Sequence, residues 1–87
     1  MQQLSSADIL RLLADHEGNF LMLDENLISI CTTDWAPILV NGTVVYVAAD
    51  IFDDLLRWDY IVEDISEVRV GLSVFRLTEI GREQAER

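Results

Sequence analysis

Short apolar runs separated by turn-forming residues occupy the middle of this sequence, and they restrict what the chain can fold into. Residues 20–23 and 27–31 are apolar and flank the trio Asp24-Glu25-Asn26. A connection of three residues can join antiparallel strands, whereas parallel strands need a crossover of a dozen residues or more. We therefore predict an antiparallel hairpin in this part of the chain.

Asn41-Gly42 is the strongest short turn signal in the chain. It stands between the apolar runs 38–40 and 43–47. Asparagine and glycine tolerate the positive φ angles that a two-residue hairpin loop requires. Two interpretations stay open: a second tight hairpin, or a bend that leads the chain into the next helix.

Residues 5–16 are predicted to form the first helix. Ser5 or Ser6 can cap its N-terminus, and apolar residues recur behind them at spacings of three and four. Gly18 is placed to end the helix, because glycine adopts the left-handed conformation of a C-terminal cap without strain.

A second helix is predicted from about residue 48 to residue 58 or 59. Its inner face consists of the apolar residues Ile51, Phe52, Leu55 and Leu56. Charged residues follow the opposite face at helical spacing. We expect Trp58 and Tyr60, which close this helix, to pack in the core.

The rest of the chain reads as a hairpin and a short helix. Residues 60–62 and 72–77 are predicted strands, joined by the polar segment 63–71. Thr78 can cap a last helix over residues 79–87.

The predicted order is therefore helix, hairpin, helix, hairpin, short helix, which is an α+β arrangement. A chain of 87 residues has room for one core, so we expect a single domain over residues 1–87. Its apolar fraction of 51% is enough to build that core without disulfides, and the single cysteine excludes an intramolecular one.

The second half of the chain, residues 44–82, resembles winged-helix (winged helix-turn-helix) domains. In those domains a helix leads into a β-wing, which closes with an aromatic-arginine-leucine-threonine-glutamate-x-glycine-arginine phrase. This chain has the phrase Phe75-Arg76-Leu77-Thr78-Glu79-Ile80-Gly81-Arg82. The resemblance implies a winged-helix-like fold of three helices with two small antiparallel hairpins. It does not decide function, because the fold serves many functions.

The charges depart from those of DNA-binding winged helices. There, the helix before the wing carries basic and amide side chains that contact phosphates and base edges. The corresponding helix here carries Asp50, Asp53, Asp54 and Arg57, and the wing carries Glu63, Asp64, Glu67 and Arg69. From Asp50 to Arg69 there are seven acids and two arginines, so a DNA groove would repel this surface.

These charged residues, together with Trp35, are the candidate partner-binding residues. The set is Asp50, Asp53, Asp54, Arg57, Glu63, Asp64, Glu67 and Trp35. The acids can imitate a nucleic-acid backbone or dock on a basic patch, and Trp35 lies in a predicted loop where it can anchor an interface. The alternative is a solvated helix face with an Asp53–Arg57 pair, and a Trp35 that covers the core.

No constellation of residues indicates catalysis. His16 follows the first helix, where it complements the helix dipole, and Cys31 sits in an apolar run as a small buried side chain. Neither has a recognisable nucleophile or base partner. We expect no enzyme activity, no metal and no cofactor.

The net charge of −10, from sixteen acids and six arginines, indicates the class of partner. A chain this acidic is repelled by nucleic acid and by anionic membranes. We predict a cytoplasmic binding module that docks on a basic, nucleic-acid-binding surface of a protein, as a small inhibitor of the phage or anti-CRISPR kind would. The alternatives are a DNA-binding regulator and a dimerisation or adaptor domain, and a homodimer is compatible with each.

Overall fold

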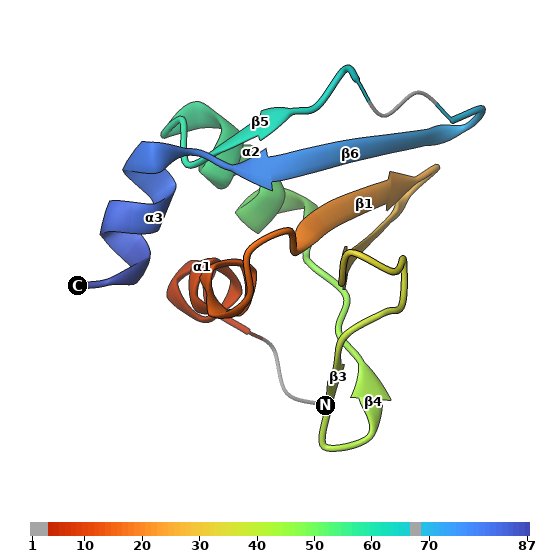
Figure 1. Ribbon diagram of the computed structural model, residues 1–87, viewed down its shortest axis with the longest axis horizontal. Helices are drawn as coiled ribbons and strands as arrows, with labels where there is room; N and C mark the ends of the chain where they lie inside the picture. Colours follow the sequence, from red (N-terminus) through yellow and green to blue (C-terminus); the bar gives the residue numbers. More distant parts are fainter. Residues whose placement is uncertain (1–3, 67–68) are drawn as a thin grey trace.

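The computed structural model describes residues 4–66 and 69–87, and it confirms the predicted α+β class (Figure 1). In chain order the elements are α1 (Ser6–Asp15), β1 (Phe20–Asp24), β2 (Leu27–Cys31), β3 (Leu39–Val40), β4 (Thr43–Val44), α2 (Ala49–Arg57), β5 (Ile61–Glu63), β6 (Leu72–Leu77) and α3 (Glu79–Ala85). None of the helices in the described ranges is long and apolar enough to cross a membrane.

Four strands form one antiparallel sheet in the order β2-β1-β6-β5. Strand β1 pairs with β2 on one side and with β6 on the other, so Leu21 lies opposite both Ile30 and Phe75. Strand β6 therefore lies between β1 and its own hairpin partner β5, and it joins the two predicted hairpins into one sheet.

Asn41-Gly42 forms a tight hairpin loop, which decides between the two interpretations that the sequence leaves open. Strands β3 and β4 pair on either side of it, with Val40 opposite Thr43. Asn41 has φ 54° and Gly42 has φ 78°, the positive angles of a two-residue hairpin loop. The hairpin projects at the bottom of the molecule in Figure 1.

Helix α1 begins where the sequence predicts. Ser5 is its N-cap: the Ser5 hydroxyl accepts a hydrogen bond from the Asp8 amide at 3.3 Å, and the Ser5 amide donates to the Asp8 carboxylate at 3.1 Å. This capping box satisfies two backbone donors, and hydrogen bonds from Ser5 lower the pKa of Asp8. Gly18, at φ 98°, turns the chain toward β1.

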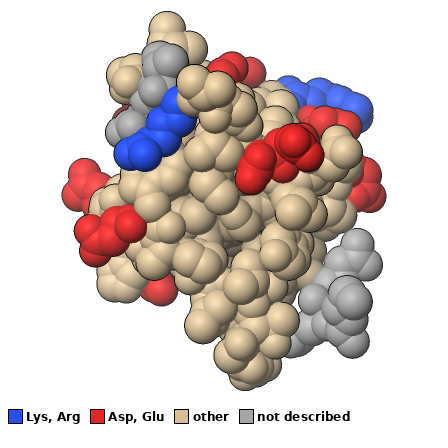
Figure 2. All heavy atoms as spheres, turned by 90° about the vertical axis from the view of Figure 1, so that its right-hand side faces the viewer, with Lys and Arg blue, Asp and Glu red and all other residues tan. Residues whose placement is uncertain are grey.

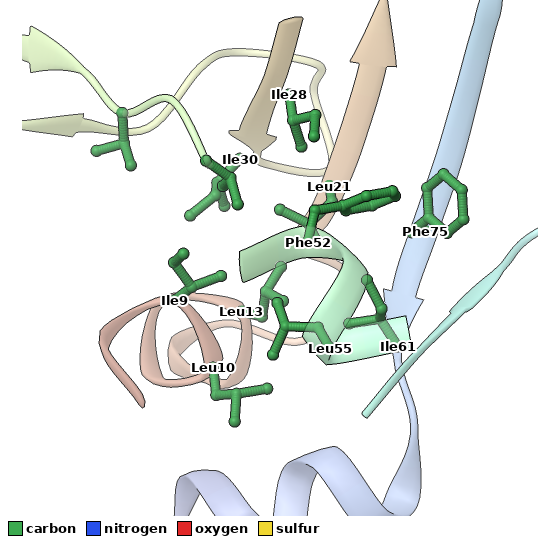
Figure 3. Close-up of a cluster of buried hydrophobic side chains, with 12 residues drawn as sticks. Ile9, Leu10, Leu13, Leu21, Ile28, Ile30, Phe52, Leu55, Ile61 and Phe75 are labelled. Atoms are coloured by element: carbon green, nitrogen blue, oxygen red, sulfur yellow. The ribbon is translucent and has the colours of Figure 1, made fainter. Parts of the chain in front are cut away.

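The main core lies between one face of the sheet, which we call the inner face, and the helices (Figure 3). Leu21 and Ile30 point from the sheet toward Leu13 of α1 and Leu55 of α2, and all four side chains are buried. Alternate residues point to the opposite face, the outer face. There Phe20, Cys31 and Val74 form a second, smaller cluster, which Met22 and Trp35 partly cover.

The prediction that Trp58 packs in the core is wrong. Its side chain is 47% exposed, and it lies beside the Tyr60 ring at a centroid distance of 5.7 Å. Tyr60 is half-buried against the main core, as predicted. Helix α2 ends at Arg57, so Trp58 falls on the turn that follows rather than on the helix's buried face.

The phrase that carries the resemblance to winged helices is explained by contacts inside the fold. The Phe75 ring packs edge-on against the Phe52 ring of α2 at 4.8 Å. The Thr78 hydroxyl accepts a hydrogen bond from the Gly81 amide at 3.0 Å and so caps α3. Gly81 is buried against the carbonyl of Tyr60, which also accepts the Thr78 amide at 2.9 Å. These residues of the phrase therefore join the β5–β6 hairpin to α2 and α3.

Gly81→Ala is expected to destabilise the protein by about 1–3 kcal/mol, the usual range for overpacking. The added Cβ would overlap the Tyr60 carbonyl oxygen and would also press on Leu77, at 2.9 Å from its Cδ1 atom. Urea unfolding measures the change. Glu83→Ala, an exposed site on the same helix, is the control and should stay within about 0.5 kcal/mol of wild type. Equal stability of both variants would contradict the close contact at Gly81.

Candidate functional site

Helix α2 presents the predicted acidic residues on its outward side. Phe52 and Leu55 are buried, so the helical period turns Asp50 and Asp53 away from the core, where both are exposed. Neither carboxylate forms an ion pair with any residue in the described ranges. Their charge is therefore available to a partner.

The ion pair on α2 differs from the Asp53–Arg57 pair of the alternative interpretation, a solvated helix face. Arg57 pairs with Asp54, three residues away, at 3.6 Å between Nη1 and Oδ1. The Asp53–Arg57 pair does not form. An exposed pair of this kind contributes at most about 1 kcal/mol, but it compensates the charge of Asp54 and leaves that of Asp53 uncompensated.

Asp50 also has a role within the fold. The N-cap of α2 is Ala48, which has no side chain that can accept a hydrogen bond from the first turn. A carboxylate in the first turn interacts favourably with the positive end of the helix dipole, by about 0.3–1 kcal/mol. Asp50 occupies that turn, so a substitution there affects both helix and surface.

Strand β5 brings Glu63 to the same side of the molecule as α2. Glu63 lies opposite Phe75 in β6, and residues opposite each other in a ladder share one face of the sheet. The Phe75 ring packs on Phe52, the residue before Asp53. Glu63 is exposed. We call Asp50, Asp53, Asp54 and Glu63 the acidic surface.

Asp64, another predicted site residue, is engaged within the fold. Its Oδ2 accepts a hydrogen bond from the Arg76 Nε at 2.6 Å, and its Oδ1 accepts from the amide of Ser66 at 3.0 Å and from the Ser66 hydroxyl. The Ser66 hydroxyl and the Arg76 guanidinium lower the pKa of Asp64 from 3.8 to about 2. Arg76 also donates to the Gly18 carbonyl at 3.3 Å, which ties the start of the β5–β6 loop to the turn before β1.

Trp35 lies on the outer face of the sheet, whereas α2 packs on the inner face. It is half-buried: its ring meets the Phe20 ring edge-on at 4.8 Å, and the Arg69 guanidinium carbon lies 4.1 Å from the Trp35 ring centroid. Its backbone is left-handed at φ 64°. The structure therefore does not bring Trp35 together with the acidic surface. The remaining predicted site residue, Glu67, lies outside the described residues.

The reactive side chains lie away from the acidic surface. Cys31 is buried in the outer-face cluster, and burial raises the pKa of its thiol. His16 is exposed at the C-cap of α1. Among residues 4–66 and 69–87, no three His, Cys, Asp or Glu side chains are placed to hold a metal ion.

Sequence reasoning missed a second surface, which is uncharged. Its side chains are Leu27 of β2, Leu39 of β3, Val44 of β4 and Tyr46. Leu27, Leu39 and Tyr46 are 58%, 55% and 59% exposed. We call these four residues the uncharged surface. The signal for it is present in the sequence: no charged residue lies between Asp34 and Asp50.

A shallow groove of about 280 Å³ between α1 and α3 brings together two arginines that are distant in the sequence. Arg11 and Arg87 line it together with Trp58 and Tyr60. Both arginines are exposed. Two arginines at this groove do not make a track for a nucleic-acid backbone, which requires a continuous positively charged channel.

Comparison with known protein families, with curated proteins and with solved structures finds no match for this chain. The resemblance to winged helices therefore stays a prediction. The structure has the helix α2 directly before the hairpin of β5 and β6, the order which that resemblance implies.

Asp64→Asn is expected to lower the melting temperature at pH 7 because it removes the charge that Arg76 and Ser66 stabilise. The folded-state pKa of Asp64 is about 2, below the usual 3.8. The ionised carboxylate therefore stabilises the fold fully above about pH 4, and this contribution is lost as the pH falls through about 2. The difference in melting temperature between wild type and Asp64→Asn should therefore become smaller as the pH is lowered from about 4 to about 2.

Glu83→Gln, which removes an exposed charge on α3, is the control for this experiment. Calorimetry between pH 2 and pH 7 gives the comparison. A gap that keeps the same size over the whole range, or that the control reproduces, would contradict the role assigned to Asp64.

Proposed function

We propose that the protein is a non-enzymatic binding module whose acidic surface docks on a basic surface of a protein partner. The observation that carries this proposal is the set of exposed carboxylates of Asp50, Asp53 and Glu63, which form no ion pair with the described residues. They come from two elements, α2 and β5, which the core holds together through Phe52 and Phe75. A partner thus meets a rigid arrangement of charges.

The partner class follows from the sign of the charge. A net charge of −10 repels phosphate backbones and attracts the arginine- and lysine-rich surfaces that bind them. A module that occupies such a surface competes with the nucleic acid. The function proposed is therefore inhibition of a nucleic-acid-binding protein by charge mimicry, of the kind that small phage-encoded inhibitors carry out.

Attraction between exposed charges is screened by salt and acts mainly on the rate of association. Binding through the acidic surface should consequently be fast, and it should weaken as salt increases.

Asp50→Lys combined with Asp53→Lys is expected to weaken partner binding by about tenfold or more, because each substitution replaces an attraction by a repulsion. The matched control is Glu83→Lys combined with Glu86→Lys at the end of α3. Each substitution adds two charge units, so both double variants change the net charge from −10 to −6. Global charge is thereby held equal, and only its position differs.

The readout is capture of proteins from a lysate of the source cell on each immobilised variant, followed by elution with rising salt. Wild type and the α3 control should retain the same nucleic-acid-binding protein, and the α2 variant should lose it. Circular dichroism verifies that each variant is folded. Retention of that protein by a folded α2 variant, at the same eluting salt concentration, would contradict the proposal.

A gel-shift assay with duplex DNA at low salt separates this function from that of a DNA-binding regulator. The proposal expects no retardation at micromolar wild-type protein, because the outward side of α2 repels phosphates. A salt-sensitive shift of the DNA would overturn the proposal and support the regulator.

A further inference from the structure

The segment between Asp34 and Asp50 is apolar on both of its sides. It contains fifteen consecutive uncharged residues, in a chain of which 25% is charged. Ile38, Val40, Val45 and Val47 pack on or in the main core. Their neighbours Leu39, Val44 and Tyr46 point to the other side, since side chains alternate along a strand. A strand with one solvated side normally carries polar residues there.

The side chains of the uncharged surface lie together on the outer side of the sheet. Tyr46 bridges to Ser29 of β2, and Leu27 is two residues from Ser29, on the same side of the strand. Leu39 lies opposite Val44 in the β3–β4 hairpin. Tyr46 follows Val44 by two residues. The strand register thus places side chains of β2, β3 and β4, together with Tyr46 after β4, on one continuous surface.

A groove lies beside this surface. It has a volume of about 460 Å³, and among its lining residues are Leu4, Val40, Val44 and Tyr46. None of the described residues that line it is charged. Figure 2, which views the side of the molecule that carries the β3–β4 hairpin, shows an uncharged area across this side, with acidic side chains to its left and above it and arginine side chains also above it.

We propose that a second copy of this chain covers the uncharged surface, so that the protein is a symmetric homodimer. The first argument is charge. Each copy carries −10, so two copies that meet through most other surfaces bring carboxylates together. At the uncharged surface, two copies bring together Leu27, Leu39, Val44 and Tyr46, and the acids Asp24 and Glu25 lie only at its edge, beside Leu27.

The second argument is shape. A two-fold interface is isologous, which means that one patch must be complementary to itself. Here a projecting hairpin forms one wall of a mainly apolar groove, because Val40, Asn41, Thr43 and Val44 of the hairpin all line it. A two-fold axis between them places each hairpin against the groove of the other copy, and both grooves are filled at once.

The dimer should strengthen with salt. Apolar contact is not weakened by screening, whereas repulsion between the acids around the two surfaces is reduced by it. Binding of a basic partner through the acidic surface weakens with salt. The two proposals therefore predict opposite salt dependences, and either one can fail without the other.

Sedimentation equilibrium of the wild-type protein at about 50 mM and 500 mM NaCl tests the dimer. We expect a mass of twice 9.9 kDa at high protein concentration, and a lower dissociation constant at the higher salt concentration. A protein that stays monomeric at both salt concentrations, up to about 1 mM protein, would overturn the proposal, because even a millimolar dissociation constant populates the dimer at that concentration.

The test variant is Leu39→Glu, which places a charge within the uncharged surface, at a side chain that is 55% exposed, and should raise the dissociation constant about tenfold or more. Ile80→Glu on α3 is the matched control, because Ile80 has a similar exposed fraction, 54%, and lies outside the surface. It should dimerise like wild type, apart from the effect of one added charge. Circular dichroism verifies that both variants are folded. Dimerisation of folded Leu39→Glu with the wild-type dissociation constant would also overturn the proposal.

Discussion

The pairing of β6 with both β1 and β5 is the interaction on which the rest of the structure depends. Without β6, the β1–β2 hairpin and the β5 strand would share no ladder. Successive residues of β6 serve opposite faces: Phe75 packs on Phe52 of α2, and Arg76 binds Asp64 and the Gly18 carbonyl. One strand thus positions α2, the start of the β5–β6 loop and the turn after α1.

Local features of the fold could be predicted from the sequence because their causes are local. The Ser5 cap, the Asn41-Gly42 hairpin and the Thr78 cap each depend on residues within four positions of one another. The outward direction of Asp50 and Asp53 likewise follows from helical period alone. The two caps and the outward direction are confirmed predictions, whereas at Asn41-Gly42 the sequence left a hairpin and a bend open, and the structure has the hairpin.

The features that could not be predicted depend on pairing between distant parts of the chain. Arg76 forms an ion pair with Asp64, twelve residues away in the sequence. Arg69, between β5 and β6, lies over the ring of Trp35, between β2 and β3. No periodicity in the sequence indicates either contact. The exposure of Trp58 has a different cause: α2 ends at Arg57, one or two residues before the predicted end at residue 58 or 59.

Two parts of the molecular surface differ in charge, and each is suited to a different partner. The acidic surface on α2 and β5 is suited to a basic partner, and the uncharged surface around the β3–β4 hairpin to a second copy. They lie on different elements, and Phe52 and Leu55 of α2 pack in the same core as Val45 and Val47. A dimer through the hairpins would therefore hold two acidic surfaces at a defined separation.

The central claim is that the acidic surface is a binding site and not one part of a uniformly negative molecule. The most direct test is to titrate the isotopically labelled protein with a short arginine-rich peptide, a probe for basic surfaces, and to follow the backbone amides by NMR. We predict that the largest changes in amide chemical shift occur around Asp50, Asp53 and Glu63. Changes of equal size around the exposed acids of α3, Glu79 and Glu83, would contradict it.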